Sequence, residues 1–447
     1  LHSNPPRRPI MSNMFHDNTM KLRISTLIMV LVGAPTLANA RDDGLLTPPM
    51  GWMSWERYGC QTDCATFPDA CINAQLFEAQ SKALVDKGFL KAGYDRVNID
   101  DCYMDTRDPV TNDLRADETR FPGGIPALSK RIRGLGFKFG VYNDIGRTTC
   151  AGNPGLNVSD TADTDADAQL KRDVELMANE WMIDSIKIDG CARPANSNMS
   201  VTYPKLGNAL NTSGRQILFS CSWPVYLALS PECNGNLGSE HCFPSDEIVA
   251  ACSTWRVFKD IMDAWNIPGH AAIIQIIDFY AENNVSLAKA NGPGHYNDYD
   301  MLLAGNPGLS VEQARIQMTM WCMWSAPLMM SSDVVNMAPE FVNILTNTEV
   351  IAVDQDAMGL SASGVYLVNN TNVMSSQVSV WYKPLSAKGT RAVALLNTGF
   401  FDGSVYNLTM TSEMVGMKRG SSFTARDLWA SKDLGTFKGS AQVDVCV

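Results

Sequence analysis

The feature that most constrains the fold is a recurring pattern in which a short run of β-forming residues ends in an acidic residue. An Asp after one strand commonly serves only to turn the chain. Here the pattern repeats, and helix-like segments separate most of its copies. The strand-like segments with acidic ends are 97–101, 139–144, 186–189, 255–260 and 296–300. The repetition predicts several carboxylates gathered at one end of a parallel sheet.

Alternation of strands and helices predicts an α/β fold. Between residues 45 and 356 the pattern gives about eight such alternations, which is typical of a (β/α)8 TIM barrel. A doubly wound open sheet is the alternative that periodicity alone leaves open. The helices are expected at 73–87, 125–135, 166–180, 271–282, 310–324 and 338–345.

The hydrophobic pattern of the sequence changes after Asp356. Short alternating runs at 378–382 and 392–396 have turns between them and no helical period. This pattern indicates a small antiparallel β-sandwich domain. We therefore expect a catalytic barrel over 41–356 and a C-terminal β domain over 357–447.

The first forty residues differ from the rest. Residues 1–19 are interpreted as a leader or upstream translation, and 20–40 as a signal peptide. Lys21 and Arg23 precede an apolar run, and Ala38 to Ala40 form a small-residue cleavage site. The run is shorter than the roughly 20 residues of a membrane span. A core helix is the alternative, and no other stretch is long and apolar enough to span a bilayer.

The composition limits the kinds of binding partner and the cellular compartment that are expected for this chain. The net charge of −11 argues against nucleic acid and anionic membranes, which bind basic surfaces. Twelve cysteines in a secreted chain should largely be paired. Glycosylation acceptor sequences agree with the secretory route and occur at Asn157, Asn198, Asn211, Asn284, Asn369 and Asn407.

The gathered acids predict hydrolysis of a glycosidic bond. That reaction needs one carboxylate at the anomeric carbon and a second that protonates the leaving oxygen, and Asp189 and Asp260 are the best-placed pair. The proton donor should have a raised pKa. A hydrated Mg²⁺ or Ca²⁺ site is the rival, since the histidines lack zinc spacing. Aromatic residues that could stack on a sugar or belong to the core are Trp55, Tyr142, Trp223 and Tyr226.

An ordered set of motifs resembles glycoside hydrolase family 27, which comprises the α-galactosidases and α-N-acetylgalactosaminidases. The resemblance covers nearly all of residues 45–440. The motifs are Met-Gly-Trp-x-x-Trp-Glu-Arg at 50–57, Asp-Asp-Cys at 100–102, Lys-Ile-Asp-Gly-Cys at 187–191, Cys-Ser-Trp-Pro at 221–224, Trp-Arg-x-Phe-x-Asp at 255–260 and Asn-Asp-x-Asp-Met at 297–301.

The resemblance implies a retaining mechanism without a cofactor or a metal. Asp189 would be the nucleophile and Asp260 the general acid/base, with carboxyls about 5–5.5 Å apart. Asp100 and Asp101 would hold the 4-OH and 6-OH of the sugar. The implied substrate-binding residues are Trp55, Asp100, Asp101, Tyr142, Lys187, Ser222, Val225, Tyr226, Arg256 and Asp300. For Lys187 the alternative is a surface-paired lysine, and Arg256 and Asp300 would face the 2-substituent.

The resemblance also implies disulfide pairs, a cellular location and an oligomeric state. The implied pairs are Cys60–Cys102, Cys64–Cys71, Cys150–Cys191 and Cys221–Cys252. Cys233 and Cys242 lie in an insertion outside the family pattern and could form a fifth bridge, whereas Cys322 is expected to be a buried thiol. Animal members of the family are commonly lysosomal homodimers, so the same location and assembly are expected.

Two positions decide the expected substrate. Galactose-specific animal members carry Glu and Leu where this chain has Ser222 and Val225, and N-acetylgalactosaminidases carry Ser and Ala. Loss of the Glu side chain leaves room for an acetamido group, so the chain is expected to remove terminal α-N-acetylgalactosamine and also α-galactose from glycolipids, glycoproteins or oligosaccharides. The alternatives are a galactoside-selective α-galactosidase, a silent sugar-binding protein and a metal-dependent barrel enzyme.

Overall fold

A computed structural model describes residues 44–362, 364–367, 378–398 and 405–446. The predicted leader, signal peptide and Asn369 lie outside the described residues, as do the side chains of Asn407 and Cys446. Within the described ranges, no helix has both the length and the apolar character that a membrane crossing requires.

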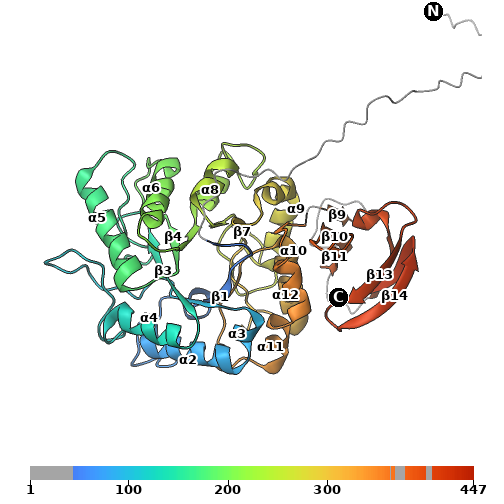
Figure 1. Cartoon of the computed structure of the whole chain (residues 1–447), viewed down its shortest axis with the longest axis horizontal. Helices are drawn as coiled ribbons and strands as arrows, with labels where there is room; N and C mark the ends of the chain where they lie inside the picture. The colour runs from blue at the N-terminus through green and yellow to red at the C-terminus, as the bar shows by residue number, and fades with distance from the viewer. Residues whose placement is uncertain (1–43, 363, 368–377, 399–404, 447) are drawn as a thin grey trace, which may run out of the picture. The chain divides into compact units, whose positions relative to one another are not determined.

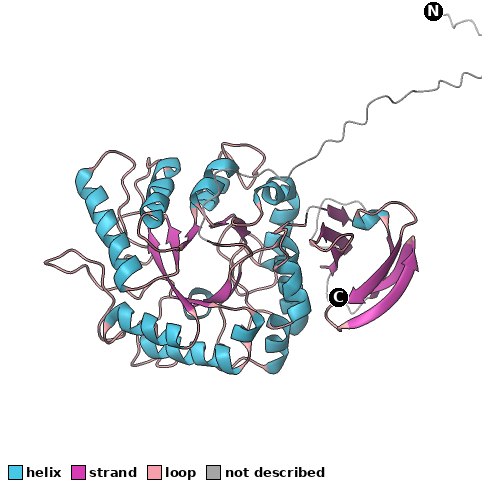
Figure 2. Cartoon of the chain, viewed as in Figure 1, coloured by secondary structure: helices cyan, strands magenta, loops and turns pink. Residues whose placement is uncertain are grey.

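Eight parallel strands form a closed ring, which confirms the TIM barrel and excludes the open sheet. The hydrogen-bonded order runs from β8 through β1 to β7. A parallel bridge between Leu302 and Met330 joins the two ends of this order just beyond β7. Figure 2 shows the strands surrounded by helices. The strands are β1 (Met50–Met53), β2 (Arg96–Asn98), β3 (Lys138–Asp144), β4 (Ser185–Asp189), β5 (Leu218–Cys221), β6 (Thr254–Arg256), β7 (Tyr296–Asp298) and β8 (Leu328–Met330).

Helices occupy the connections between the strands (Figure 1). Side-chain caps fix several of their starts: the Asn73 side chain accepts the N–H of Leu76, and Ser310 accepts that of Gln313. The helices are α1 (Trp55–Tyr58), α2 (Ala74–Asp86), α3 (Phe89–Ala92), α4 (Gly124–Gly134), α5 (Thr164–Glu175), α6 (Met199–Asn211), α7 (Trp223–Ala228), α8 (Ser245–Ala251), α9 (Ile273–Ala290), α10 (Val311–Trp324), α11 (Pro339–Leu345) and α12 (Thr348–Asp354).

One helix is longer than its sequence pattern indicated. Helix α9 continues to Ala290, whereas the helix was expected at 271–282. Asn283 lies on the buried face, where its Nδ2 donates to the Phe279 carbonyl, and Leu287 is fully buried one turn further on. The apolar face therefore continues past the polar residues at helical spacing.

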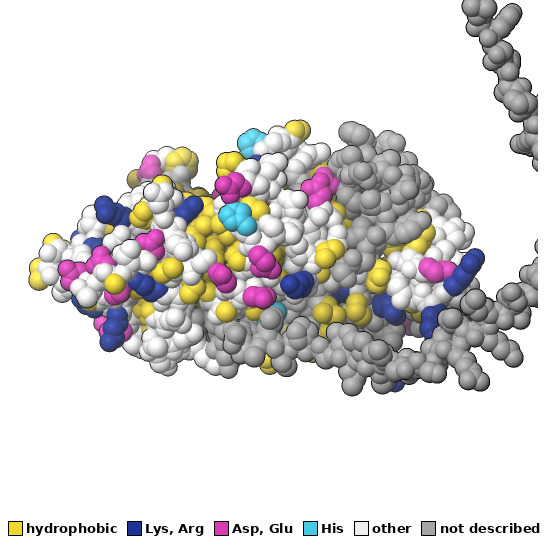
Figure 3. Space-filling view, turned by 90° about the horizontal axis from the view of Figure 1, so that it is seen from above, with side chains coloured by type: hydrophobic (Ala, Val, Ile, Leu, Met, Phe, Trp, Pro, Cys, Tyr) yellow, Lys and Arg dark blue, Asp and Glu magenta, His cyan; other side chains and the backbone are white. Residues whose placement is uncertain are grey.

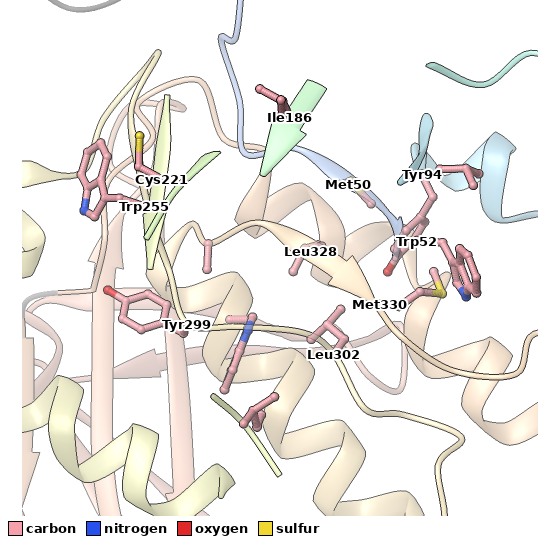
Figure 4. Packing of buried hydrophobic residues seen from close by; sticks show 14 of the residues in the cluster. Met50, Trp52, Tyr94, Ile186, Cys221, Trp255, Tyr299, Leu302, Leu328 and Met330 are labelled. Atoms are coloured by element: carbon pink, nitrogen blue, oxygen red, sulfur yellow. The ribbon is translucent and has the colours of Figure 1, made fainter. Parts of the chain in front are cut away.

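The barrel core is apolar and densely packed. Figure 4 shows part of it, including Met50 and Trp52 of β1 and Leu328 and Met330 of β8, each at most 4% exposed. The indole Nε1 of Trp52 donates to the carbonyl of Ser332 at 2.9 Å, as a buried indole requires. This packing holds the strand ends in fixed positions.

The C-terminal part forms antiparallel sheets, as predicted. Strands β9 (Gly364–Leu367), β10 (Val378–Pro384) and β11 (Arg391–Asn397) form a three-stranded sheet. A four-stranded sheet contains β12 (Val405–Thr411), β15 (Ser440–Cys446), β14 (Lys432–Lys438) and β13 (Ser422–Asp427) in that order. On the face of the molecule in Figure 3, acidic and basic side chains are interspersed.

Candidate active site

A cavity of about 340 Å³ is lined by every residue that the sequence analysis assigned to substrate binding or catalysis. Most of its lining comes from the C-terminal ends of the barrel strands or the loops directly after them, where TIM barrels carry their sites. The predicted residues in its lining are Trp55, Asp100, Asp101, Tyr142, Lys187, Asp189, Ser222, Val225, Tyr226, Arg256, Asp260 and Asp300. Trp223 does not line the cavity; it stacks on Tyr203 in the core with ring centroids 5.9 Å apart.

A buried ion pair forms the floor of the cavity. Lys187 Nζ lies 2.7 Å from Asp100 Oδ2, and the two side chains are 11% and 2% exposed. Burial raises the pKa of Asp100, while the Lys187 ammonium opposes that rise. Lys187 also lies over the Tyr142 ring, 5.2 Å from its centroid. The alternative of a surface-paired lysine is therefore wrong, because Lys187 points into the buried floor.

Asp101 holds a loop beside the floor. Its Oδ1 accepts from Thr149 Oγ1 at 2.9 Å and from Asn153 Nδ2 at 3.0 Å, and its Oδ2 accepts from the N–H of Ala151 at 3.0 Å. The backbone N–H of Cys102 also donates to Oδ1 at 2.7 Å. These hydrogen bonds hold the Asp101 side chain in one orientation and fix the position of the loop.

Asp189 ends strand β4 and presents its carboxylate to the cavity. The Tyr226 hydroxyl donates to Oδ1, the N–H of Gly190 donates to the same oxygen at 3.0 Å, and the Tyr142 hydroxyl donates to Oδ2 at 3.3 Å. Burial, with Asp189 nearby, raises the pKa of the Tyr226 hydroxyl, so this group remains a donor. The tyrosines and the backbone together fix the orientation of the carboxylate.

Asp260 lies in a loop four residues beyond the end of β6, so the strand ends earlier than the pattern indicated. Its side chain is 85% exposed, and its Oδ1 lies 3.1 Å from Arg256 Nη2. Arg256 lowers the pKa of Asp260, which contradicts the raised pKa expected of a proton donor. The physical reason is the adjacent guanidinium, which stabilises the ionised carboxylate.

Arg256 also contacts Asp300, whose Oδ2 lies 2.8 Å from the same Nη2. Burial raises the pKa of Asp300, and Arg256 opposes this effect. The backbone φ of Asp300 is +76°, a left-handed value that non-glycine residues rarely adopt. Tight hydrogen bonding keeps it there: Oδ2 accepts the N–H of Ile261 at 2.8 Å. One guanidinium thus links the two carboxylates on this side of the cavity.

Five disulfides support the site and its surroundings. The structure forms the four pairs that the resemblance implied, and Cys233 pairs with Cys242 as a fifth. Cys150 and Cys191 line the cavity, whereas Cys322 is a buried free thiol. Both sulfurs near Asp189 are bonded to each other, so they cannot coordinate a metal as thiolates.

Comparison with known proteins assigns the fold and the cavity to a family. Residues 47–356 match the family described as alpha galactosidase A, and 375–445 match the alpha galactosidase C-terminal beta sandwich domain. The chain belongs to glycoside hydrolase family 27. It is therefore a glycoside hydrolase, and the barrel that carries the cavity is the part of the chain that matches the first of these two families.

Two human family members resemble the chain to the same degree. It is 36% identical to human alpha-N-acetylgalactosaminidase over 367 residues, 82% of this chain and 81% of the relative. It is 37% identical to human alpha-galactosidase A over 361 residues, 80% of this chain and 76% of the relative. The solved structure of alpha-galactosidase I from Mortierella vinacea aligns with a TM-score of 0.74 and 28% identity, covering 91% of this chain and 96% of that one. Overall identity therefore does not select the substrate.

Sequence reasoning missed two residues of the cavity lining, Leu229 and Lys259. Glu56 does not line the cavity, but its carboxyl interacts electrostatically with Asp300 and Asp260 of the lining. Burial and the charges of Asp300 and other acids raise the pKa of Glu56 to about 8. Lys259 precedes Asp260 directly, which was a usable signal. No motif of the sequence analysis includes Leu229, so nothing in the sequence pointed to it.

Proposed function

We propose that the chain is a retaining exo-glycosidase that removes terminal α-linked N-acetylgalactosamine, and also α-galactose, from glycoconjugates by double displacement. The observation that carries the proposal is the wall of the cavity, where Ser222 and Val225 stand in the same lining as Asp189 and Asp260. Small side chains at this wall leave room for an acetamido group at C2 of the sugar.

In the first step, an Asp189 oxygen attacks the anomeric carbon and forms a glycosyl ester as the bond to the leaving oxygen breaks. Asp260 gives its proton to that oxygen. In the second step, Asp260 takes a proton from water, whose oxygen attacks the anomeric carbon and releases Asp189. The donors that fix Asp189 support its role as nucleophile, since they hold the attacking carboxylate in one orientation.

The proton on Asp260 requires a change at Arg256. In the structure the Arg256 guanidinium contacts Asp260 and lowers the pKa of its carboxyl, which favours the ionised form. A substrate whose 2-substituent accepts hydrogen bonds from Arg256 draws charge away from Asp260, which then holds its proton more readily. An acidic pH also increases the fraction of Asp260 that is protonated. The pairing of Arg256 with Asp300 keeps the guanidinium beside C2 during this exchange.

Specificity follows from size and polarity at the wall. Ser222 is 3% exposed, and its N–H donates to the Ile188 carbonyl at 3.0 Å, so its position is fixed by the barrel. Val225 is intermediate in size between the Leu and the Ala of the two specificity types. Apolar pockets separate small size differences by only about 1–3 kcal/mol. We therefore expect appreciable activity on plain α-galactosides.

The test is the ratio of kcat/KM on the α-N-acetylgalactosaminide and the α-galactoside of one chromogenic phenol at acidic pH. The proposal predicts a ratio well above one. A ratio well below one would identify an α-galactosidase, and activity on neither substrate would indicate a silent sugar-binding protein. Ser222→Glu combined with Val225→Leu should shift the ratio toward the galactoside; an unchanged ratio would refute the specificity argument.

We also propose that the chain enters the secretory pathway and works as a homodimer in the lysosome. The signal-peptide pattern and five disulfides support the route. Asn157, Asn198 and Asn211 are exposed acceptors, whereas Asn284 donates its Nδ2 to Ala281 inside α9. Glycopeptide mass spectrometry and light scattering test these points: unmodified exposed sites or a monomer would contradict them.

A further inference from the structure

The cavity changes in character from floor to rim. The floor consists of buried, paired charges, such as Lys187 and Asp100. The rim contains Leu229, which is 39% exposed, and the exposed Lys259. Asp260 lines the same cavity, and its side chain is 85% exposed. In an exo-glycosidase the terminal sugar fills the buried part, and the acid lies at the glycosidic oxygen. The rim beyond the acid therefore faces the leaving group.

Lys259 differs from the other cations of the cavity lining in its ion pairing. The other two cations of the lining, Lys187 and Arg256, are both paired with carboxylates. In the part of the chain that the structure describes, Lys259 has no ion-pair or hydrogen-bond partner. Its charge is therefore available to a group on the substrate, and an anionic one interacts with it favourably.

Leu229 caps the C-terminus of helix α7 and precedes the insertion that contains Cys233 and Cys242. Its N–H donates to the Val225 carbonyl at 3.0 Å, which ends helix α7. The insertion then folds back, with the N–H of Gly235 donating to the Ala228 carbonyl at 2.7 Å, and Cys233–Cys242 closes it. The N–H of Leu237 donates to Asn283 Oδ1 at 2.8 Å and anchors the insertion to α9. These hydrogen bonds and the disulfide fix the backbone on both sides of Leu229, so its side chain has a defined position at the rim.

We propose that Leu229 and Lys259 form a leaving-group subsite that favours an acidic sugar as the aglycone. A pyranose offers an apolar C–H face for Leu229 and, in a uronic acid, a carboxylate for Lys259 at its edge. This inference rests on the proposed glycosidase function and names the neighbour of the sugar that is removed. The subsite adds selectivity for the group released in the first step.

The experiment compares two disaccharides in which α-N-acetylgalactosamine is joined through the same linkage to glucuronic acid or to glucose. At low salt, kcat/KM should favour the acidic disaccharide by up to about fivefold, the upper end of the range of a solvent-exposed ion pair. The preference should fall to about one in Lys259→Met and reverse in Lys259→Glu. The matched control Lys130→Met removes the same charge from the exposed surface of α4 and should keep the preference.

Equal kcat/KM values for the two disaccharides in the parent enzyme, or a preference that survives Lys259→Met, would overturn the subsite. A charge preference seen only with an acidic glycopeptide, and not with the glucuronide, would also overturn it. A chromogenic α-N-acetylgalactosaminide measured in parallel separates the two proposals. Failure to cleave this substrate refutes the glycosidase function, whereas cleavage without a charge preference refutes only the subsite.

Discussion

Replacing Lys187 with Met tests the buried ion pair at the floor of the site. Met keeps much of the length and apolar stem of lysine but removes the ammonium 2.7 Å from Asp100 Oδ2. The Asp100 side chain is 2% exposed, so solvent cannot replace the lost partner. Removing one member of a buried pair commonly costs about 3–5 kcal/mol, because the other charge remains buried and unpaired. We expect a loss of this size in the free energy of unfolding at pH 7.

The pH dependence identifies the cause of the loss. Without Lys187, the pKa of Asp100 rises further, because burial already raises it and the opposing ammonium is gone. The folded variant then binds a proton that the unfolded chain, with an Asp pKa near 3.9, releases. Its stability falls as pH rises from about 4 through the folded pKa. The deficit relative to the parent should therefore be smaller at pH 4.5 than at pH 7.

Urea unfolding with intact disulfides at the two pH values measures this deficit. The double variant Lys187→Met, Asp100→Asn removes both charges and should regain most of the stability at pH 7 without regaining activity. A loss below about 1 kcal/mol at pH 7, or the same loss at both pH values, would refute the reasoning, since either result means that no unpaired buried carboxylate was created.

Three further predictions concern the surroundings of the site. Asp189→Asn should lower kcat by at least about 10⁴-fold with an unchanged circular-dichroism spectrum, and substantial residual turnover would exclude Asp189 as the nucleophile. Glu56, with a pKa of about 8, destabilises the fold as pH rises from 4.5 to 8, so Glu56→Gln should gain melting temperature relative to the parent over that range; a constant difference would contradict this. Replacing Cys150 and Cys191 with Ser should lower both stability and kcat/KM, and normal kcat/KM in a less stable variant would show that the bridge does not shape the site.

Much of the barrel could be predicted because each strand end left a local signal. The strand that ends at Asp189 was found from alternation followed by Asp and Gly. The same rule placed Asp260 at a strand end, although β6 ends at Arg256. There the guanidinium turns to the Phe258 carbonyl and to Asp260, and the chain leaves the sheet while its sequence still alternates. Alternation alone does not distinguish a strand from such a turn.

The electrostatics of the site could not be read from the sequence. The lowered pKa of Asp260 and the raised pKa of Glu56 depend on burial and on charges from separate segments, which only the folded chain brings together. The four implied disulfides came from family resemblance and not from cysteine spacing, which permits many pairings. Cys233–Cys242 lies outside that resemblance, so its pairing remained open until the fold placed the two residues together.

The most direct test of the mechanism is covalent trapping of the glycosyl–enzyme intermediate. The enzyme would be incubated with a fluorinated galactosyl fluoride, digested with protease and mapped by mass spectrometry. The double-displacement account predicts one sugar ester, on the carboxylate of Asp189, and loss of activity in step with labelling. A label on another residue, or product with an inverted anomeric configuration, would contradict it.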